Sequence, residues 1–524
     1  NLTINSCPGC TDPSANNYNP YATIEDSTCL YSPFVFGCTD SLALNYNTLA
    51  TVDDSSCCYT SGQLWSQIGQ DIDGESAIDY SAFAISISSD GGTVAIGAPY
   101  NDGNGPNSGH VRVYENIGGS WTQIGQDIDG ESASDFSGRS VSLSSNGNTV
   151  AIGARINAGN GINSGHVRVY ENIGGSWSQI GQDIDGEAAG DYSGFSVSLS
   201  SDGSILAIGA HTNDGNGLNS GHVRIYENTG GSWSQIGQDI DGESTSDFSG
   251  RSVSLSNDGG IVAIGATNND DNGLNSGHVR IYENTSGYWS QIGQDIDGEA
   301  SEDESGHSVS LSSDGNTVAI GAQRNDGNGL NSGHVRIYQN IGGSWFQIGQ
   351  DIDGEASEDE SGFSVSLNAD GNTIAIGAQR NDGNGSNSGH VRIYENTSGS
   401  WTQIGQDIDG EASDDYNGHS VSLSNDGNTV AIGADGNDGN GTDAGHVRVY
   451  NLSTPCADLG CLDPLALNFD PNATVSDSTC IYPNYGCLDL LALNYNSLAN
   501  IDDGSCNYCT NDTSYTNIIS CGSV

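Results

Sequence analysis

Acidic and amide side chains recur at a fixed interval in two short stretches of this sequence, and their types suit cation binding. One stretch reads DIDGExxxxD and includes Asp127, Asp129, Glu131 and Asp135 in one copy, while the other reads NDGNGxNSG and begins at Asn213 in another. Calcium prefers carboxylate and carbonyl oxygens on glycine-containing loops. Turn formation is the alternative interpretation, because Asp and Asn bond their own backbone and glycine supplies positive φ. No copy spells a complete EF-type loop, so both interpretations stay open.

A histidine and an arginine also recur together, two residues apart. The histidines are His110, His166, His222, His278, His334, His390 and His446, and the arginines run from Arg112 to Arg448. We expect His, Arg and the following Tyr to share one side of a strand, with valines on the other side. Polar contacts between neighbouring units are then the simplest role, with arginines pairing to acids such as Asp129 or Glu131. A catalytic role is disfavoured because no unique nucleophile or acid stands beside these histidines.

Paired cysteines mark both ends of the chain. Four segments place two cysteines 19 residues apart, and they predict the disulfides Cys10–Cys29, Cys38–Cys57, Cys461–Cys480 and Cys487–Cys506. Such small units cannot build a sufficient apolar core, so a cross-link is the natural support. Zinc is the alternative, but no CxxC pairs face one another and no histidine lies inside the segments. These segments resemble the short GCTDPxAxNYNPxATxDDGSC repeats of secreted bacterial and algal proteins, and their acidic ends, Asp53-Asp54 and Asp502-Asp503, are further candidate calcium ligands.

The elements that must position these residues are set by a tandem repeat. The tryptophans stand 56 residues apart, at positions 65, 121, 177, 233, 289, 345 and 401. One unit contains four runs with strand character, 121–128, 140–144, 149–154 and 166–171, and no stretch with a helical apolar period. Four strands in each of seven units predict an all-β, seven-bladed propeller. A β-solenoid is the alternative, although its coils are usually much shorter.

The order of strands within a blade can also be predicted. The small residues of 140–144 suit the crowded axis, and the longer, more polar run 121–128 suits the outer edge. The first copy of that outer run, residues 65–72, would then complete the last blade and close the ring. Closure brings Cys58 near Cys456 and predicts a disulfide between them. Cys509 is predicted to pair with Cys521, which leaves Cys7 for a link to another chain.

The repeat resembles a known family. The text FSVSLSSDGSILAIGA at 195–210, followed by GHVRIYE at 221–227, is similar to the FG-GAP repeats of the integrin α-subunit head. The resemblance implies a seven-bladed propeller. In that family calcium binds a DxDxDG-type loop between the first two strands of a blade, but the corresponding loop here, Ser312–Thr317, is too short to surround a cation. The metal sites of the family are therefore not transferred to this chain.

Few positions depart from the repeat. Glu304 and Glu360 replace an aromatic residue, Ala158 replaces a loop aspartate, and Asp435-Gly436 is peculiar to the last unit. None of these departures assembles a catalytic triad, a phosphate-binding loop or a zinc signature. We find no set of residues unique to particular blades near the axis, which argues against an enzyme.

Composition indicates the environment of the protein. The 12 basic residues are all arginine, and with 67 acidic residues they give a formal charge of −55. This charge disfavours nucleic acid and anionic membranes as partners, and no apolar run approaches the length that spans a membrane. The absence of Met predicts a processed product or fragment whose signal peptide is gone. Candidate glycosylation sites are Asn1, Asn284, Asn384, Asn396, Asn440, Asn451, Asn472 and Asn511.

These features predict a domain order of two cysteine modules, a propeller, two further modules and a tail. The predicted boundaries are 1–34, 35–60, 61–456, 457–483, 484–508 and 509–524. The favoured function is that of an extracellular or cell-surface, non-enzymatic structural or adhesive protein that assembles with itself head-to-tail through the modules. The alternative is a calcium-dependent, lectin-like or receptor-like propeller that binds glycans or cell-surface proteins. An enzyme is the third possibility, which the residues do not favour.

Overall fold

The computed structural model describes the repeat region continuously and the flanking regions in pieces. The described residues are 64–453, with 8–9, 24–25, 459–460, 463–464, 466, 475–476, 482–489, 496, 499–511 and 519–523. The chain divides into two compact units, Leu64–Ser453 and the flanking segments together. All regular elements of the described residues are strands, and no helix among them has the length and apolar character needed to cross a membrane.

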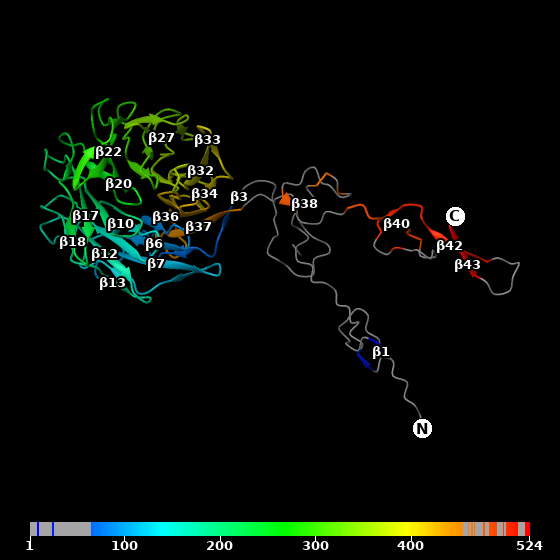
Figure 1. Ribbon diagram of the computed structural model, residues 1–524. Coiled ribbons are helices and arrows are strands. Elements are labelled where there is room, and N and C mark those ends of the chain that lie inside the picture. The colour runs from blue at the N-terminus through cyan, green and yellow to red at the C-terminus, as the bar shows by residue number, and fades with distance from the viewer. Residues whose placement is uncertain are drawn as a thin grey trace, which may run out of the picture. The chain divides into compact units, whose positions relative to one another are not determined.

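The repeats form seven blades, and each blade is one sheet of five strands (Figure 1). The innermost strands, called A, are β5 (Ala84–Ile87), β10 (Ser137–Leu143), β15 (Ser196–Leu199), β20 (Ser249–Leu255), β25 (Ser308–Leu311), β30 (Ser364–Leu367) and β35 (Ser420–Leu423). The B strands are β6 (Thr93–Ala98), β11 (Thr149–Ala154), β16 (Ile205–Ala210), β21 (Ile261–Ala266), β26 (Thr317–Ala322), β31 (Thr373–Ala378) and β36 (Thr429–Ala434).

The outer half of each blade contains strand C and a divided strand D. The C strands are β7 (His110–Ile117), β12 (His166–Asn172), β17 (His222–Asn228), β22 (His278–Thr285), β27 (His334–Ile341), β32 (His390–Thr397) and β37 (His446–Ser453). The D strands are β3 (Leu64–Gln67), β8 (Ser120–Gln123), β13 (Trp177–Gln179), β18 (Trp233–Gln235), β23 (Tyr288–Gln291), β28 (Ser344–Gln347) and β33 (Ser400–Gln403). The D′ strands are β4 (Ile72–Asp73), β9 (Ile128–Asp129), β14 (Ile184–Asp185), β19 (Ile240–Asp241), β24 (Ile296–Asp297), β29 (Ile352–Asp353) and β34 (Ile408–Asp409).

The outermost strand differs from the prediction, which took residues 65–72 as one strand. Both β3 and β4 pair with strand C, but the backbone between them leaves the sheet. Gly69 adopts a φ of 77° in this excursion, a conformation that glycine accepts without strain. Gln70 then donates its amide hydrogen to the carbonyl oxygen of Trp121 in the next blade, at 2.9 Å. The interruption thus uses the outer strand to bind the neighbouring blade.

The ring closes as predicted. Strand β3, from the start of the repeat region, pairs antiparallel with β37 from its end, with Trp65 opposite Leu452. Strands β5 and β35, the first and last A strands, are also in contact, and Figure 1 shows β36 and β37 beside β6 and β7. The blade that contains β37 is therefore completed by β3, whose residues stand more than 380 positions before their partners. Trp65 Nε1 also donates to the carbonyl oxygen of Ile404 in the preceding blade, at 2.9 Å.

The apolar core lies between the blades. Seven separate clusters of buried residues are present in the propeller, and each joins the valine side of one C strand to the A and B strands of the next blade. In one cluster Val167 and Val169 contact Leu206, Ile208 and Trp233. Burial of this surface contributes about 25 cal/mol for each Å² of apolar area. Because every cluster spans two blades, no blade can bury its apolar side chains alone.

The flanking unit contains short two-stranded sheets. They pair β1 (Pro8–Gly9) with β2 (Ile24–Glu25), β38 (Leu459–Gly460) with β39 (Val475–Ser476), β40 (Tyr485–Gly486) with β41 (Ile501–Asp502), and β42 (Asn507–Asn511) with β43 (Ile519–Ser523). The first three sheets are parallel and recur at equivalent places of three cysteine segments.

Candidate functional site

One position varies from repeat to repeat although its neighbours do not. It immediately precedes the Ser-Val-Ser-Leu run of strand A or, in the first repeat, its counterpart. The seven residues at this position, called the axial ring, are Phe83, Arg139, Phe195, Arg251, His307, Phe363 and His419. With the Ser and Val side of the A strands they line one cavity of about 330 Å³ on the propeller axis. This cavity is within the range that small-molecule sites occupy.

The aromatic and cationic members of the axial ring stack on one another. The guanidinium carbon of Arg139 lies 4.4 Å from the ring centre of Phe83 and 4.4 Å from that of Phe195. Arg251 also lies over the Phe195 ring, at 5.3 Å from its centre. Cations over aromatic faces gain electrostatic energy from the ring quadrupole. These contacts fix the guanidinium groups at the wall of the cavity.

The remaining contacts close the ring. Arg251 Nη2 and His307 Nε2 are 2.9 Å apart, and the rings of His307 and Phe363 are 4.8 Å apart. Phe363 contacts His419 edge to face at 5.0 Å, and His419 contacts Phe83 at 4.6 Å. Every member therefore touches both of its neighbours, so the cavity has a continuous wall of planar side chains.

This end of the axis also collects the arginine and histidine side chains that the repeat does not explain. Outside strand C the propeller contains five arginines and three histidines: Arg139, Arg155, Arg251, Arg324, Arg380, His211, His307 and His419. Most line the axial cavity or the two smaller cavities beside it, of about 240 and 180 Å³. Arg380 occupies the position equivalent to Arg324, one repeat later. In a chain of formal charge −55, this concentration of positive groups marks a distinct site.

Two of these arginines are neutralised by the acidic departures. Arg324 pairs with Glu304 at 2.9 Å, and Arg380 pairs with Glu360 at 3.3 Å. Gln323 donates a further hydrogen bond to Glu304 at 2.9 Å. At positions 304 and 360, glutamate replaces an aromatic residue of other repeats. Each of these glutamates has an arginine that pairs with it.

The other three arginines have no carboxylate partner among the described residues. The Nε atoms of Arg139 and Arg155 are buried and make no hydrogen bond within residues 64–453. Burial and the neighbouring guanidinium groups of Arg155 and Arg251 lower the pKa of Arg139 well below its usual range. Burial also lowers the pKa of Arg251. Because a guanidinium stays protonated in proteins, these shifts describe charges held in unfavourable surroundings, which an anion would relieve.

A histidine beside the ring is also left with an open hydrogen-bonding atom. His211 packs against Phe195 with ring centres 3.9 Å apart. Burial and the nearby arginines lower the pKa of His211 to about 3, so the imidazole is neutral at pH 7. Its Nδ1 is buried without a hydrogen-bond partner in the described propeller.

The axial ring was not predicted from the sequence, and the expectation that no blade-specific set surrounds the axis was wrong. The tandem repeat places one position of every blade at the same height on the axis. Aligning the seven copies and looking for a position that varies would therefore have found the ring. The departures that drew attention, Glu304, Glu360 and Asp435, are its outer neighbours, and Asp435 accepts from His419 Nδ1 at 3.0 Å.

The repeated histidines and arginines occupy the joints between blades, as predicted. Arg168 donates to the backbone carbonyl oxygen of Asp129 at 2.8 Å and lies 3.7 Å from Glu131. His166 Nδ1 lies 4.0 Å from the other carboxylate oxygen of Glu131. Burial, aided by Arg168, lowers the pKa of His166 to about 4. The side chains of strand C thus link each blade to the preceding one.

The four predicted calcium ligands Asp127, Asp129, Glu131 and Asp135 are not brought together. Asp127 and Asp129 line one pocket, and Glu131 and Asp135 line the next. Asp135 accepts hydrogen bonds from Ser132 N at 2.9 Å and Asn157 Nδ2 at 3.1 Å, which is the turn role.

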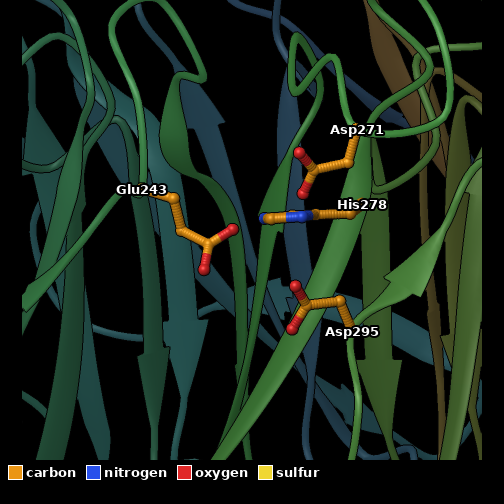
Figure 2. A group of neighbouring side chains, drawn as sticks. All are labelled: Glu243, Asp271, His278 and Asp295. Atoms are coloured by element: carbon orange, nitrogen blue, oxygen red, sulfur yellow. The ribbon is translucent and has the colours of Figure 1, made fainter.

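The carboxylates are instead shared between repeats. Glu131 and His166 are grouped with Asp183, the equivalent of Asp127 in the next repeat, and their candidate ligand atoms lie within 4.8 Å of one another. Related groups recur around the propeller, and Figure 2 shows the one that includes Glu243. The sequence placed these residues in one loop, whereas the fold assembles each group across the boundary between blades.

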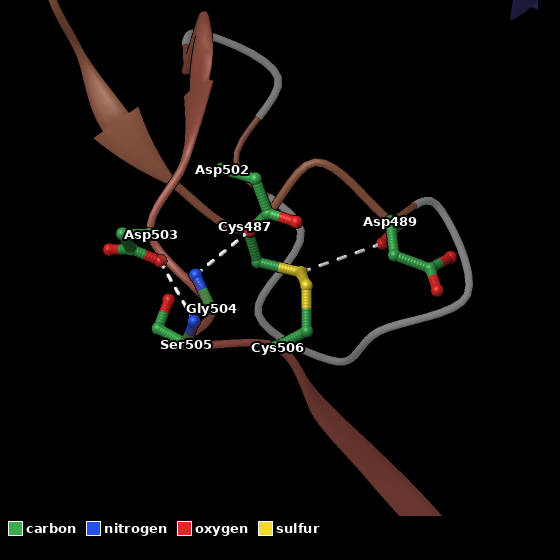
Figure 3. The surroundings of a disulfide bond; sticks show 7 residues. All are labelled: Cys487, Asp489, Asp502, Asp503, Gly504, Ser505 and Cys506. Carbon is green, nitrogen blue, oxygen red and sulfur yellow. Dashed lines mark hydrogen bonds between the residues drawn. A yellow bond between two sulfur atoms is a disulfide. The ribbon is translucent and has the colours of Figure 1, made fainter.

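One predicted disulfide of the cysteine segments is present in the described residues. Cys487 is bonded to Cys506 (Figure 3). Asp502 and Asp503 accept hydrogen bonds from Gly504 N and Ser505 N, at 3.0 and 2.9 Å, and so form the turn before Cys506. The register of β42 and β43 sets Cys509 opposite Cys521. The following predictions lie outside the described residues: Cys7, Cys10–Cys29, Cys38–Cys57, Cys58–Cys456, Cys461–Cys480, and Asp53 with Asp54.

The candidate glycosylation sites have different surroundings. The side-chain amides of Asn384 and Asn440 each donate to two backbone carbonyl oxygens of an adjacent loop, at 2.8 and 3.1 Å. A glycan on either amide would have to displace one of these bonds. Asn284 and Asn396 accept from the hairpin glycines Gly287 and Gly399, each at 2.8 Å. Asn451 lies in β37, Asn511 lies in β42, and Asn1 and Asn472 fall outside the described residues.

Comparison with known proteins supports the repeat assignment. Four segments, residues 184–226, 240–282, 296–338 and 352–394, match the FG-GAP repeat model. Each begins at a D′ strand and ends in the C strand of the next blade. No curated protein matches the sequence.

Solved structures with a similar chain course have low sequence identity. The hydrazine synthase of Kuenenia stuttgartiensis is 13% identical, with 70% of this chain and 94% of that chain covered and a TM-score of 0.45. The periplasmic gluconolactonase PpgL of Pseudomonas aeruginosa is 17% identical, with 63% and 86% covered and a TM-score of 0.42. Four of the seven repeats therefore match the FG-GAP model, and the seven repeats together form a seven-bladed propeller.

Proposed function

We propose that the protein is a non-enzymatic, extracellular binding protein whose axial ring holds an acidic sugar unit of a glycan. The observation that carries this proposal is the alternation of arginine and aromatic side chains around one cavity. Arg139 and Arg251 present fixed guanidinium groups that form no ion pair with a carboxylate among the described residues, and Glu304 favours the charge of Arg251 only from beside the ring. Guanidinium groups bind carboxylate and sulfate through paired, charge-assisted hydrogen bonds.

The aromatic members favour a sugar over a simple anion. Phe195 is buried in the ring and Phe83 and Phe363 are half-buried, with all three lining the cavity. Apolar ring faces pack against the C–H faces of a pyranose and add apolar contact area. A volume of about 330 Å³ suits one or two sugar units.

The lining supports binding rather than catalysis. It contains Ser, Val, Ala, Ile, Phe, Arg and His but neither Asp nor Glu. The Ser140 hydroxyl donates to the carbonyl oxygen of Gly194 at 2.9 Å, and His307 faces Arg251 and a backbone carbonyl. No lining serine is thus paired with a histidine that could activate it as a nucleophile. The extracellular assignment is supported by the disulfide Cys487–Cys506, a bond typical of oxidising compartments.

Calorimetry with Arg139→Gln tests the proposal, using the full-length protein and a panel of uronic-acid, sulfated and neutral oligosaccharides. Loss of one charge-assisted contact costs about 1.5–3 kcal/mol, so we expect binding of the acidic ligand to weaken by roughly tenfold to more than a hundredfold. Arg380→Gln is the matched control, because it removes the same charge from the same end of the axis, where Glu360 already compensates it.

Equal affinity of wild type and Arg139→Gln for every acidic oligosaccharide would contradict the proposal. A chelator arm tests the predicted calcium dependence separately. Head-to-tail self-assembly remains a prediction that sedimentation of the oxidised protein would check.

A further inference from the structure

One loop position has a different residue in a single repeat than in the other six. The loop between strands B and C reads Asn-Asp-Asp-Asn-Gly at 269–273, where the other repeats have glycine in place of Asp271. The equivalent glycines are Gly103, Gly159, Gly215, Gly327, Gly383 and Gly439. Their φ angles are not positive, so the backbone conformation admits a side chain. A Cβ at Gly215 would lie 2.9 Å from Asn213 Oδ1, so that side chain must shift to make room. The sequence interpretation overlooked this departure.

Asp271 adds a fourth side chain to a group that has fewer members elsewhere. Glu243 follows β19 of the preceding blade, Asp271 lies after β21, His278 begins β22 and Asp295 precedes β24. Figure 2 shows the His278 ring edge-on, with the Glu243 carboxylate opposite its tip and the Asp271 and Asp295 carboxylates on either side of the ring plane. One candidate ligand atom of each residue lies within 4.8 Å of those of the others. The groups around Glu75, Glu131 and Glu187 each contain three such residues.

The clustering of these side chains is one observation that points to a ligand, and the unpaired state of His278 is a second. His278 is 1% exposed, and neither ring nitrogen has a hydrogen-bond partner among the described residues. A buried polar group without a partner is costly. In five other blades the equivalent Nδ1 lies 3.9–4.0 Å from the glutamate. Among the described residues no such pair forms at His278 or His446, and Arg280 holds Glu243 at 3.3 Å.

Arg280 and the loop backbone orient the candidate ligands. The guanidinium binds Glu243 Oε1 at 3.3 Å and so holds the carboxylate in place. The Asp271 amide donates to Asn269 Oδ1 at 3.0 Å, which fixes the backbone from which the Asp271 side chain projects. Equivalent contacts recur in the other blades, so the repeat supplies the support for the site and Asp271 is what this blade adds.

We propose that Glu243, Asp271, His278 and Asp295 form a binding site for one divalent transition-metal ion, with Zn²⁺ as the probe. Zn²⁺ binds imidazole nitrogen and carboxylate oxygen at about 2.0–2.2 Å, so ligand atoms around one ion lie up to about 4 Å apart. Small side-chain rotations bring atoms spaced within 4.8 Å to that range. An imidazole among the ligands favours a transition metal over calcium, which prefers oxygen ligands only. Three carboxylates supply the compensating charge.

Counting bound metal in matched variants tests the site. Full-length, oxidised protein is equilibrated with Zn²⁺, dialysed, and analysed for metal per chain. Asp271→Gly restores the residue of the other six repeats, so the loop should fold normally. We expect the Zn²⁺ count to fall by one in Asp271→Gly, and the melting temperature to lose its increase with Zn²⁺.

A second variant, in the neighbouring blade, tests whether a fourth carboxylate is sufficient to create a metal site there. Gly215→Asp adds the fourth carboxylate beside Glu187, His222 and Asp239, and we expect the Zn²⁺ count to rise by one. Because the comparison uses differences between variants, Zn²⁺ held by cysteines or by scattered acids cancels.

An unchanged Zn²⁺ count in folded Asp271→Gly would overturn the proposal. Stoichiometric Ca²⁺ in place of Zn²⁺, lost in Asp271→Gly, would overturn the assignment to a transition metal. A folded Gly215→Asp protein that gains no ion would overturn the claim that the fourth carboxylate is what the other groups lack.

Discussion

At the scale of single residues, the repeat assigns the same side chain to opposite roles according to its neighbours. Arg168 lies between blades, where the Asp129 carbonyl and Glu131 satisfy it. Arg139 lies on the axis between two phenylalanine rings and forms no ion pair with a carboxylate among the described residues. The first is a structural arginine and the second is available to a ligand. Partner atoms, rather than residue type, distinguish the two.

The repeated histidines predict acid sensitivity at this scale. His166 has a pKa of about 4 in the folded protein, against about 6.5 when unfolded. The unfolded chain therefore binds more protons as the pH falls below about 7, and stability decreases from there towards pH 4. Each such histidine costs about 1–2 kcal/mol at pH 5. Burial raises the pKa of Glu131, which opposes this trend at a lower pH.

Thermal unfolding between pH 7 and 5, with chelator present, checks the prediction. We expect the melting temperature to fall with pH, and His166→Gln to show a shallower fall than the wild type, whatever its stability at pH 7. If the melting temperatures of the two proteins fell equally steeply with pH, His166 would have the same pKa in the folded and the unfolded chain, and the prediction would be wrong.

At the scale of elements, the divided outer strand explains how blades hold one another. β3 and β4 both pair with β37, and the segment between them reaches the next blade through Gln70. Trp65 adds a buried indole, 3% exposed, whose Nε1 donates to Ile404 of the preceding blade. The closing strand thus joins both sheet hydrogen bonding and the apolar core.

Removal of the closing strand should open the ring. A chain that begins at residue 74 lacks β3 and β4, exposes the edge of β37 and uncovers the cluster around Trp65. We expect it to unfold at a much lower temperature and to aggregate, since exposed edges pair with other chains. The control begins at residue 64 and keeps the compact unit. Trp65→Ala alone should cost about 3–5 kcal/mol in urea unfolding. Equal melting temperatures for the two truncated chains would rule out closure by β3.

The fold was largely predictable because every repeat carries the same strand pattern, so each copy supports the interpretation of the others. Strand character, Trp spacing and the leftover outer run at 65–72 together indicated seven blades and their closure. The break at Gly69 was not predicted, because its cause is a contact between Gln70 and a residue 51 positions later.

The site was harder to predict for a related reason. Asp127 and Glu131 look like one ligand set along the chain, but the fold sends them to separate pockets. The axial ring joins residues 56 positions apart, and only their common place in the repeat connects them. Asp271 shows the same limit, since a single changed loop residue acquires meaning only beside Glu243 and His278.

At the scale of the whole molecule, the distribution of charge is uneven. The chain carries a formal charge of −55, yet the arginines that lack acidic partners gather at one end of the propeller axis. The acidic surface disfavours nonspecific anion binding. An anionic ligand would therefore be retained at the axial ring rather than on the surface at large. The axial ring and the candidate metal group share no residue, so we expect anion binding and metal binding to occur at separate sites.

The most direct test is a crystal structure of the propeller with the tightest-binding acidic oligosaccharide. The account predicts density on the axis, with a carboxylate or sulfate bonded to Arg139 or Arg251 and a sugar face against Phe195 or Phe363. Ligand density confined to the loops between blades, with the axial cavity holding only solvent, would contradict it.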